Sequence, residues 1–216
     1  ATSRIRLGTA VTPLARRRPA VVAAQVASLD RLSGGRAILG VGLGGVEAEF
    51  TAFGEPTAQR GQRTDEALQV VTGLWSGEPF THHGTHYRID GVTFAPVPVQ
   101  RPRVPVWIGG TSAAAHRRAA RWDGWVVGCD NEQGEMILSA GELARGVAQV
   151  LAHRTADEPF DVAITGVSAG PEDPVFAEYA EAGVTWWLEH LHERRAEPDV
   201  LMSRVLAGPP SGAHSG

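Results

Sequence analysis

The run Gly109-Gly110-Thr111-Ser112 has the composition of an anion-binding loop. It follows the apolar run Val104–Ile108 and opens a predicted helix, Ser112–Arg121. Glycine lets a backbone approach a ligand closely, and the free N–H groups at a helix start point toward an anion that the helix dipole favours. Ser112 can cap this helix or donate its hydroxyl group to a phosphate oxygen. The residues alone leave a phosphate site and a simple N-cap both open.

A second glycine-rich loop, Gly42-Leu43-Gly44-Gly45, follows the apolar run Ala37–Val41. Ligands gather at the carboxyl ends of strands in parallel α/β folds, so this loop is a second candidate for contact with a bound molecule. The first acidic residues after it are Glu47 and Glu49. Glu49 either reaches the pocket from a short helix or lies on a solvated helix face.

Five of the eight histidines stand in two groups. His82, His83 and His86 stand in a predicted hairpin, where no cysteine or paired acid completes a set of metal ligands. His190 and His192 follow the last predicted strand, at the end where barrel chemistry occurs, so an active-site role is open for either. We predict no metal site.

Asp123 and Asp130 flank the run Trp125–Gly128, and the lone cysteine, Cys129, directly follows that run. We expect Cys129 to be buried and inert. A single cysteine excludes an internal disulfide within this chain and fits a reducing compartment.

Apolar periodicity predicts an α/β fold in which about six parallel strands alternate with helices. The expected strands are Ile5–Val11, Ala37–Val41, Val104–Ile108, Gly124–Val127, Val162–Val167 and Val184–Leu188. The expected helices are Pro19–Ser33, Val46–Phe53, Gln59–Trp75, Ser112–Arg121, Met136–His153, Pro174–Ala182 and Glu193–Leu206. The segment Phe80–Val99 has no helical period and predicts a small β-hairpin excursion around an Asp90-Gly91 turn.

The first of these helices, Pro19–Ser33, has clear start and stop signals in the sequence. Proline at position 19 suits a first helical turn, and Ser33-Gly34-Gly35 predicts its end. Apolar residues recur at helical spacing between these limits, at Val22, Val26, Leu29 and Leu32.

Composition is ordinary for a soluble globular protein and favours neither a nucleic-acid-binding nor a membrane protein. The 216 residues predict a single domain over residues 1–207 and a disordered tail at 208–216. The net charge of −4 does not indicate a nucleic-acid-binding surface, and no apolar run is long enough to span a membrane. All 20 basic residues are arginine, so this chain offers no catalytic or P-loop lysine. Without a signal-like start, we expect a cytoplasmic protein.

Five segments together resemble a known family. They are IRLGTAVTP, SLDRLSGGRAILGVGLG, RTDEALQVVTGLWSGEP, PVQRPRVPVWIGGTS and RRAARWDGW, in that order between Arg4 and Val127. Their residues and order resemble the luciferase-like monooxygenase superfamily, and within it the branch of oxidoreductases that use the deazaflavin F420.

The resemblance implies a TIM-barrel fold of eight strand–helix units, in which Ile5–Val11 corresponds to the third strand. This chain therefore predicts an incomplete TIM-barrel-type fold without the first two units. We expect a truncated chain. The alternatives are that another chain supplies the missing strand–helix units of the barrel, or that the fold has rearranged. Open strand edges invite association, so a homodimer is expected.

The resemblance also implies a cofactor site. The phosphate would lie at Gly109–Ser112, with a further phosphate contact at Val127 and Gly128, and the backbone of the loop from Gly42 would lie along the ring or side chain. The strand end Gly8–Val11 would lie behind the ring, with a cis peptide between Ala10 and Val11. The complete implied set is Thr9, Ala10, Val11, Gly42, Gly44, Gly109, Gly110, Thr111, Ser112, Val127 and Gly128.

No catalytic residue is assigned. Relatives that act on sugar phosphates carry an acidic general acid where this chain has Gly45, and the family's usual catalytic histidine follows a strand that is absent here. The resemblance implies hydride transfer between F420 and a small organic substrate. The alternatives are an FMN-dependent monooxygenase of the same superfamily and a non-catalytic remnant that acts as a dimeric structural or binding protein.

Overall fold

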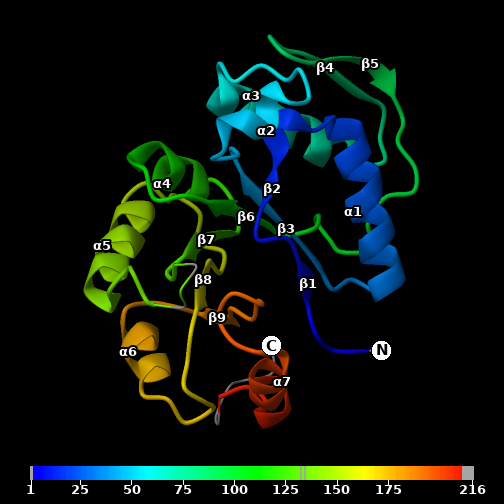
Figure 1. Ribbon diagram of the computed structural model, residues 1–216. Helices are drawn as coiled ribbons and strands as arrows, with labels where there is room; N and C mark the ends of the chain where they lie inside the picture. The colour runs from blue at the N-terminus through cyan, green and yellow to red at the C-terminus, as the bar shows by residue number, and fades with distance from the viewer. Residues whose placement is uncertain (1, 132, 134, 211–216) are drawn as a thin grey trace. The chain divides into compact units, whose positions relative to one another are not determined.

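The computed structural model describes residues 2–131, 133 and 135–210. The chain divides into two compact units, Ala1–Gly109 and Gly110–Gly216 (Figure 1). Of the predicted disordered tail, residues 211–216 lie outside the described residues. Among the residues that the structure describes, no helix combines the length and the hydropathy needed to cross a membrane.

The first unit is built around one buried strand, β3. Its elements are β1 (Leu7–Gly8), β2 (Thr12–Pro13), a 3-10 turn (Leu14–Arg16), α1 (Pro19–Ser33), β3 (Ala37–Gly42), α2 (Glu47–Thr51), α3 (Arg60–Leu74), β4 (Phe80–His83), β5 (Arg88–Val92) and β6 (Val106–Gly109). Strands β1, β2 and β6 all pair with β3 in parallel, and every residue of β3 is buried. Helices α1 and α3 pack together, and α1 also contacts β3.

The predicted single strand Ile5–Val11 is wrong, because the structure has two short strands, β1 and β2, with a bulge between them. Three residues, Thr9–Val11, stand opposite two residues of β3, Leu39 and Gly40. The Thr9 hydroxyl group donates to the carbonyl oxygen of Gly40 at 2.8 Å, so a side chain takes a position that a backbone amide would occupy in a regular ladder.

Helix α1 begins at Pro19 as predicted and ends at Gly34, whose φ of 68° is the left-handed conformation that glycine tolerates. The apolar spacing within it does not mark the core-facing side throughout, since Leu32 is 88% exposed. The fully buried Asp30 faces inward instead.

The carboxylate of Asp30 ties α1 to the segment that precedes β6. It accepts hydrogen bonds from the backbone N–H groups of Val99 and Gln100, at 2.7 and 3.0 Å, and from the Gln100 side-chain amide at 2.6 Å. Buried carboxylates are tolerated when hydrogen bonds replace those of water, and this one is satisfied by three donors.

The predicted hairpin forms from β4 and β5, but its turn is not at Asp90-Gly91, which lies within β5. The chain reverses at residues 84–87, where the Gly84 amide donates to the Tyr87 carbonyl oxygen. The Glu66 carboxylate of α3 fixes this turn, because it accepts from the backbone N–H groups of His86 and Tyr87. Burial raises the pKa of Glu66, but these hydrogen bonds outweigh it and lower the pKa overall.

The second unit repeats the strand–helix pattern. Its elements are α4 (Ala113–Ala119), β7 (Gly124–Gly128), α5 (Ala140–Leu151), β8 (Asp161–Gly166), α6 (Val175–Glu181), β9 (Trp186–Glu189) and α7 (Pro198–Ala207). Strands β7, β8 and β9 pair in parallel in that order (Figure 1). The strand positions confirm the predicted six, since β1 and β2 together replace the first.

Helix α5 begins later than the predicted Met136. Ser139 and Glu142 form a capping box, in which the serine hydroxyl accepts from the Glu142 amide and the glutamate accepts from the Ser139 amide. This reciprocal cap fixes the helix start at Ala140. Cys129 is buried, as expected, and burial raises the pKa of its thiol to about 12.

Candidate functional site

In the first unit, the bulge Thr9–Val11 rests on glycines of two neighbouring strands. A Cβ atom on Gly40 would lie 1.7 Å from the Thr9 carbonyl oxygen, and one on Gly42 would lie 2.5 Å from a Val11 methyl group. A Cβ atom on Gly109 would lie 3.1 Å from Val11. The bulge can approach β3 and β6 this closely only because these positions carry no side chain.

The peptide bond between Ala10 and Val11 is cis, which confirms the prediction made for that bond. The bulge lies level with the carboxyl-terminal half of β3, where the sequence places a ligand.

The loop after β3 is shaped by Phe50 of α2. Gly44 has a φ of +82°, and a Cβ atom there would lie 2.7 Å from the Phe50 ring. The Arg60 guanidinium donates to the Gly44 carbonyl oxygen at 2.8 Å. Glu49 forms an ion pair with Arg16 at 2.8 Å on an exposed helix face. Of the two predicted positions for Glu49, the structure shows the solvated helix face.

In the second unit, Gly110, Thr111 and Ser112 are exposed and lead into α4. The Ser112 hydroxyl accepts from the Ala115 amide at 3.2 Å and is therefore the N-cap of α4. The Trp125 indole N–H donates to the Gly110 carbonyl oxygen at 2.8 Å, and this ring is almost fully buried in β7. The loop is thus anchored from within its own unit.

This capped loop keeps donors for an anion. The amides of the first helical residues have no intrahelical acceptor, and the cap engages only that of Ala115. The Ser112 oxygen accepts in the cap, so its hydroxyl hydrogen stays available to donate. The N-cap and the phosphate site, which the sequence leaves open as alternatives, are compatible.

The other predicted phosphate contact lies at the end of β7. Val127 is buried in the core, whereas Gly128 is exposed and pairs with Thr165 of β8. Of the two predicted contact residues, Val127 and Gly128, only Gly128 is exposed to solvent.

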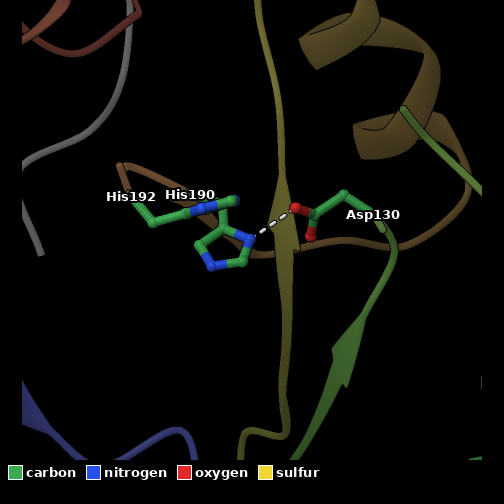
Figure 2. Close-up of side chains that lie close together, drawn as sticks. All are labelled: Asp130, His190 and His192. Atoms are coloured by element: carbon green, nitrogen blue, oxygen red, sulfur yellow. Dashed lines mark hydrogen bonds and ion pairs between the residues drawn. The ribbon is translucent and has the colours of Figure 1, made fainter. Parts of the chain in front are cut away.

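Two residues beyond Gly128, Asp130 belongs to a cluster that the sequence does not predict. Its side chain is 1% exposed, and one carboxylate oxygen is hydrogen-bonded to Nδ1 of His190, which follows β9. The other oxygen accepts from the Thr165 hydroxyl at 2.8 Å. Figure 2 shows the Asp130 carboxylate directed at the His190 ring.

His192 completes the cluster. Its ring centroid lies 4.4 Å from that of His190, and its Nδ1 accepts from the Arg194 amide at 3.2 Å. Its Nε2 is buried and has no hydrogen-bond partner within the part of the chain that the structure describes. Each of the three side chains offers one ligand atom within 4.8 Å of the others.

The cluster faces a recess of about 670 Å³ in the second unit. The residues that line it are Asp130, Asn131, Gln133, His190, His192, Glu193 and Arg194. A carboxylate that fixes one ring nitrogen of a histidine leaves the other nitrogen free for proton transfer, and the same groups are metal ligands.

A charged network holds the backbone beside His190. Glu189, the last residue of β9, pairs with Arg195 at 2.8 Å and with Arg204 at 3.2 Å, and it accepts from the Ser168 hydroxyl at 2.6 Å. Arg195 also donates to the His190 carbonyl oxygen at 2.6 Å. Burial raises the pKa of Glu189, but the hydrogen bonds from Ser168, Trp187 and Arg195 outweigh it and lower the pKa overall.

We expect Glu189→Gln to cost about 3 kcal/mol of unfolding free energy at pH 7, because it leaves two mostly buried arginines without their carboxylate. A lowered folded-state pKa contributes stability above the unfolded-state value, near 4.3, and loses it as pH falls through the folded-state value. The difference between wild type and variant should therefore shrink below about pH 4.3. Urea unfolding across pH measures it, with exposed Glu181→Gln as the control. A pH-independent difference would contradict the assignment.

Sequence reasoning places His190 and His192 at a strand end but does not pair them with Asp130. The aspartate and the histidines follow β7 and β9, which are separated by β8, and only the register of all three strands brings them together. The sequence signal that could have indicated this cluster is an aspartate and a His-x-His motif, each just after a predicted parallel strand.

Comparisons with known proteins give a consistent picture. A family model described as luciferase-like monooxygenase matches residues 1–206. The chain is 37% identical over 110 residues to an FMNH2-dependent dimethylsulfone monooxygenase of Pseudomonas putida, covering 50% of the chain and 30% of that protein. It is 41% identical over 123 residues to an F420-dependent glucose-6-phosphate dehydrogenase of Microbacterium testaceum, covering 56% and 36%. The chain spans less than half the length of either curated relative.

Among solved structures, the monooxygenase RslO1 from Streptomyces bottropensis matches with a TM-score of 0.67 and 26% identity, over 84% of this chain and 55% of that one. These likenesses confirm the predicted incomplete TIM-barrel-type fold.

Proposed function

Because this chain belongs to the luciferase-like monooxygenase family, we propose that it is an oxidoreductase that transfers hydride between F420 and a small organic substrate. When bound, the deazaflavin supplies the hydride chemistry, while the protein supplies orientation and electrostatics.

The observation that carries this proposal is the exposed, anchored loop Gly110–Ser112. Trp125 fixes its backbone through the Gly110 carbonyl oxygen, and the start of α4 presents amide and hydroxyl donors without a competing carboxylate on the loop. Such a donor set fits a cofactor phosphate. The resemblance assigns a separate role to Thr9–Val11 in the first unit, as the backbone behind the cofactor ring, and its close seating on Gly40, Gly42 and Gly109 supports that role.

An FMN-dependent monooxygenase is the second candidate. The similarity to an FMNH2-dependent dimethylsulfone monooxygenase and to the monooxygenase RslO1 favours it. Both cofactors carry a phosphate group, so the same loop serves either.

Thermal melting with F420, FMN and riboflavin tests the proposal, because a ligand of the native state raises the melting temperature. We expect F420 to raise it most. A larger shift with FMN would favour the monooxygenase, and no shift with either would sustain the non-catalytic remnant and overturn both enzymatic candidates.

The variant Ser112→Ala tests the phosphate loop itself. It removes the cap of α4 and should cost about 1 kcal/mol of stability. Ser139→Ala removes the cap of α5 at similar cost and is the matched control. Only Ser112→Ala should weaken FMN binding relative to riboflavin, which lacks the phosphate; equal effects on both ligands would contradict a phosphate contact.

A further inference from the structure

We propose that Asp130, His190 and His192 form a binding site for one divalent transition-metal ion of the Zn²⁺ type. This site lies wholly within the second unit and does not depend on which flavin or deazaflavin the protein uses.

The three side chains already converge on one another. The hydrogen bond between Asp130 and Nδ1 of His190 brings a carboxylate oxygen and a ring nitrogen side by side (Figure 2). The ligand atoms of all three residues lie within 4.8 Å of one another. Ligands around one Zn²⁺ at about 2.0–2.2 Å are separated by roughly 3.3–3.5 Å. The Asp130–His190 pair therefore opens to admit the ion, and the loop that carries His192 moves inward to complete the set.

The unpartnered nitrogen of His192 is an independent indication of a ligand. Nε2 is buried without a hydrogen-bond partner among the described residues, and burying a polar atom in this way costs free energy. A cation that binds there recovers this cost.

Each histidine binds a metal ion through a ring nitrogen that carries no proton. At His190 this atom is Nδ1, which gives up its hydrogen bond to Asp130. At His192 it is Nε2, and Nδ1 then carries the proton and gives up the 3.2 Å hydrogen bond from the Arg194 amide. The Asp130 carboxylate supplies the negative charge of the site.

Rigid support and an open face complete the site. Thr165 holds the second oxygen of Asp130, and the Glu189 network holds the backbone at His190. Two imidazoles and one carboxylate suit Zn²⁺, Fe²⁺ or Co²⁺ rather than Mg²⁺ or Ca²⁺, which prefer oxygen ligands. The three side chains line the recess, from which water can supply the remaining ligand.

Titration of the chelator-treated 216-residue chain with Co²⁺ tests the site, because bound Co²⁺ has visible absorption bands that report its ligands. We expect one ion per chain with a micromolar or tighter Kd, displacement by Zn²⁺, and no displacement by equimolar Mg²⁺. Asp130→Asn and His192→Gln should each weaken binding at least about tenfold.

The control variant is His83→Gln. His83 is also paired with an aspartate, Asp90, but this pair lies on the exposed hairpin of the first unit, and among the described residues no third ligand group joins it. We expect Co²⁺ affinity to stay within about twofold of wild type in this variant.

The outcomes separate clearly. His192 is half-buried and follows the last strand, whereas the Asp130 side chain is almost fully buried, so His192→Gln should fold even if Asp130→Asn does not, and melting without metal checks both. A Kd unchanged by His192→Gln, an equal loss in His83→Gln, or no Co²⁺ bands in wild type would each overturn the proposal. Metal binding without any flavin or F420 binding would leave this site standing while the proposed oxidoreductase fails.

Discussion

Replacing Gly40 with alanine is expected to destabilise the first unit by more than about 3 kcal/mol, enough to remove most of the folded protein. The added methyl group would lie 1.7 Å from the Thr9 carbonyl oxygen, which is backbone and cannot rotate away. The bulge would have to leave β3, and the hydrogen bond from the Thr9 hydroxyl to the Gly40 carbonyl oxygen would be lost with it. Urea unfolding, or soluble yield if the variant does not fold, measures this effect.

The matched control is Gly45→Ala in the loop that follows the same strand. A Cβ atom there has no neighbour within 4 Å, and Gly45 is not among the glycines with positive φ. Its unfolding free energy should stay within about 0.5 kcal/mol of wild type. Equal stability of the Gly40 and Gly45 variants would show that the bulge does not depend on the missing side chain.

The second large effect is expected at Asp30. Asp30→Ala removes the common acceptor of three donors from Val99 and Gln100. A hydrogen bond to a charged group contributes about 1.5–3 kcal/mol, so we expect the loss of these three to cost at least about 3 kcal/mol. Urea unfolding measures the total, and hydrogen exchange at the Val99 and Gln100 amides shows where the structure opens.

Asp30→Asn separates the shape of this side chain from its charge. Asparagine keeps one carbonyl oxygen as an acceptor but directs an N–H group at donors, so an intermediate loss is expected. If Asp30→Ala unfolds like wild type and both amides stay protected, the carboxylate is not what joins α1 to the segment before β6.

The order of strands and helices could be predicted because each buried strand is a short apolar run bounded by glycine or proline. Both ends of α1 were also visible, in Pro19 and Gly34. The family resemblance added the cis bond at Ala10–Val11, which no local pattern of these residues indicates.

Two of the errors share one physical origin, which is a contact between residues far apart in sequence. The turn of the hairpin is set by Glu66, some twenty positions before it, rather than by the favourable Asp90-Gly91 pair. The inward side of α1 is set by Asp30 through partners near position 100. Apolar spacing cannot reveal either, because both depend on a charged side chain whose burial is paid by distant donors.

The candidate site divides in the same way. The glycine and hydroxyl positions at strand ends follow from local sequence, and their exposure in the Gly110–Ser112 loop agrees with it. The Asp130–His190 pair depends on the register of three strands, which local sequence does not supply.

The seating of Val11 on Gly42 and Gly109 has a consequence for how this sequence can change over time. The methyl groups of Val11 fill the space that side chains at both glycines would need, so neither glycine is free to gain a side chain while the valine is present. A smaller residue at position 11 would open both glycines to alanine, whereas either alanine would be harmful if it came first. Substitutions here are therefore expected in one order, in which Val11 changes before Gly42 or Gly109.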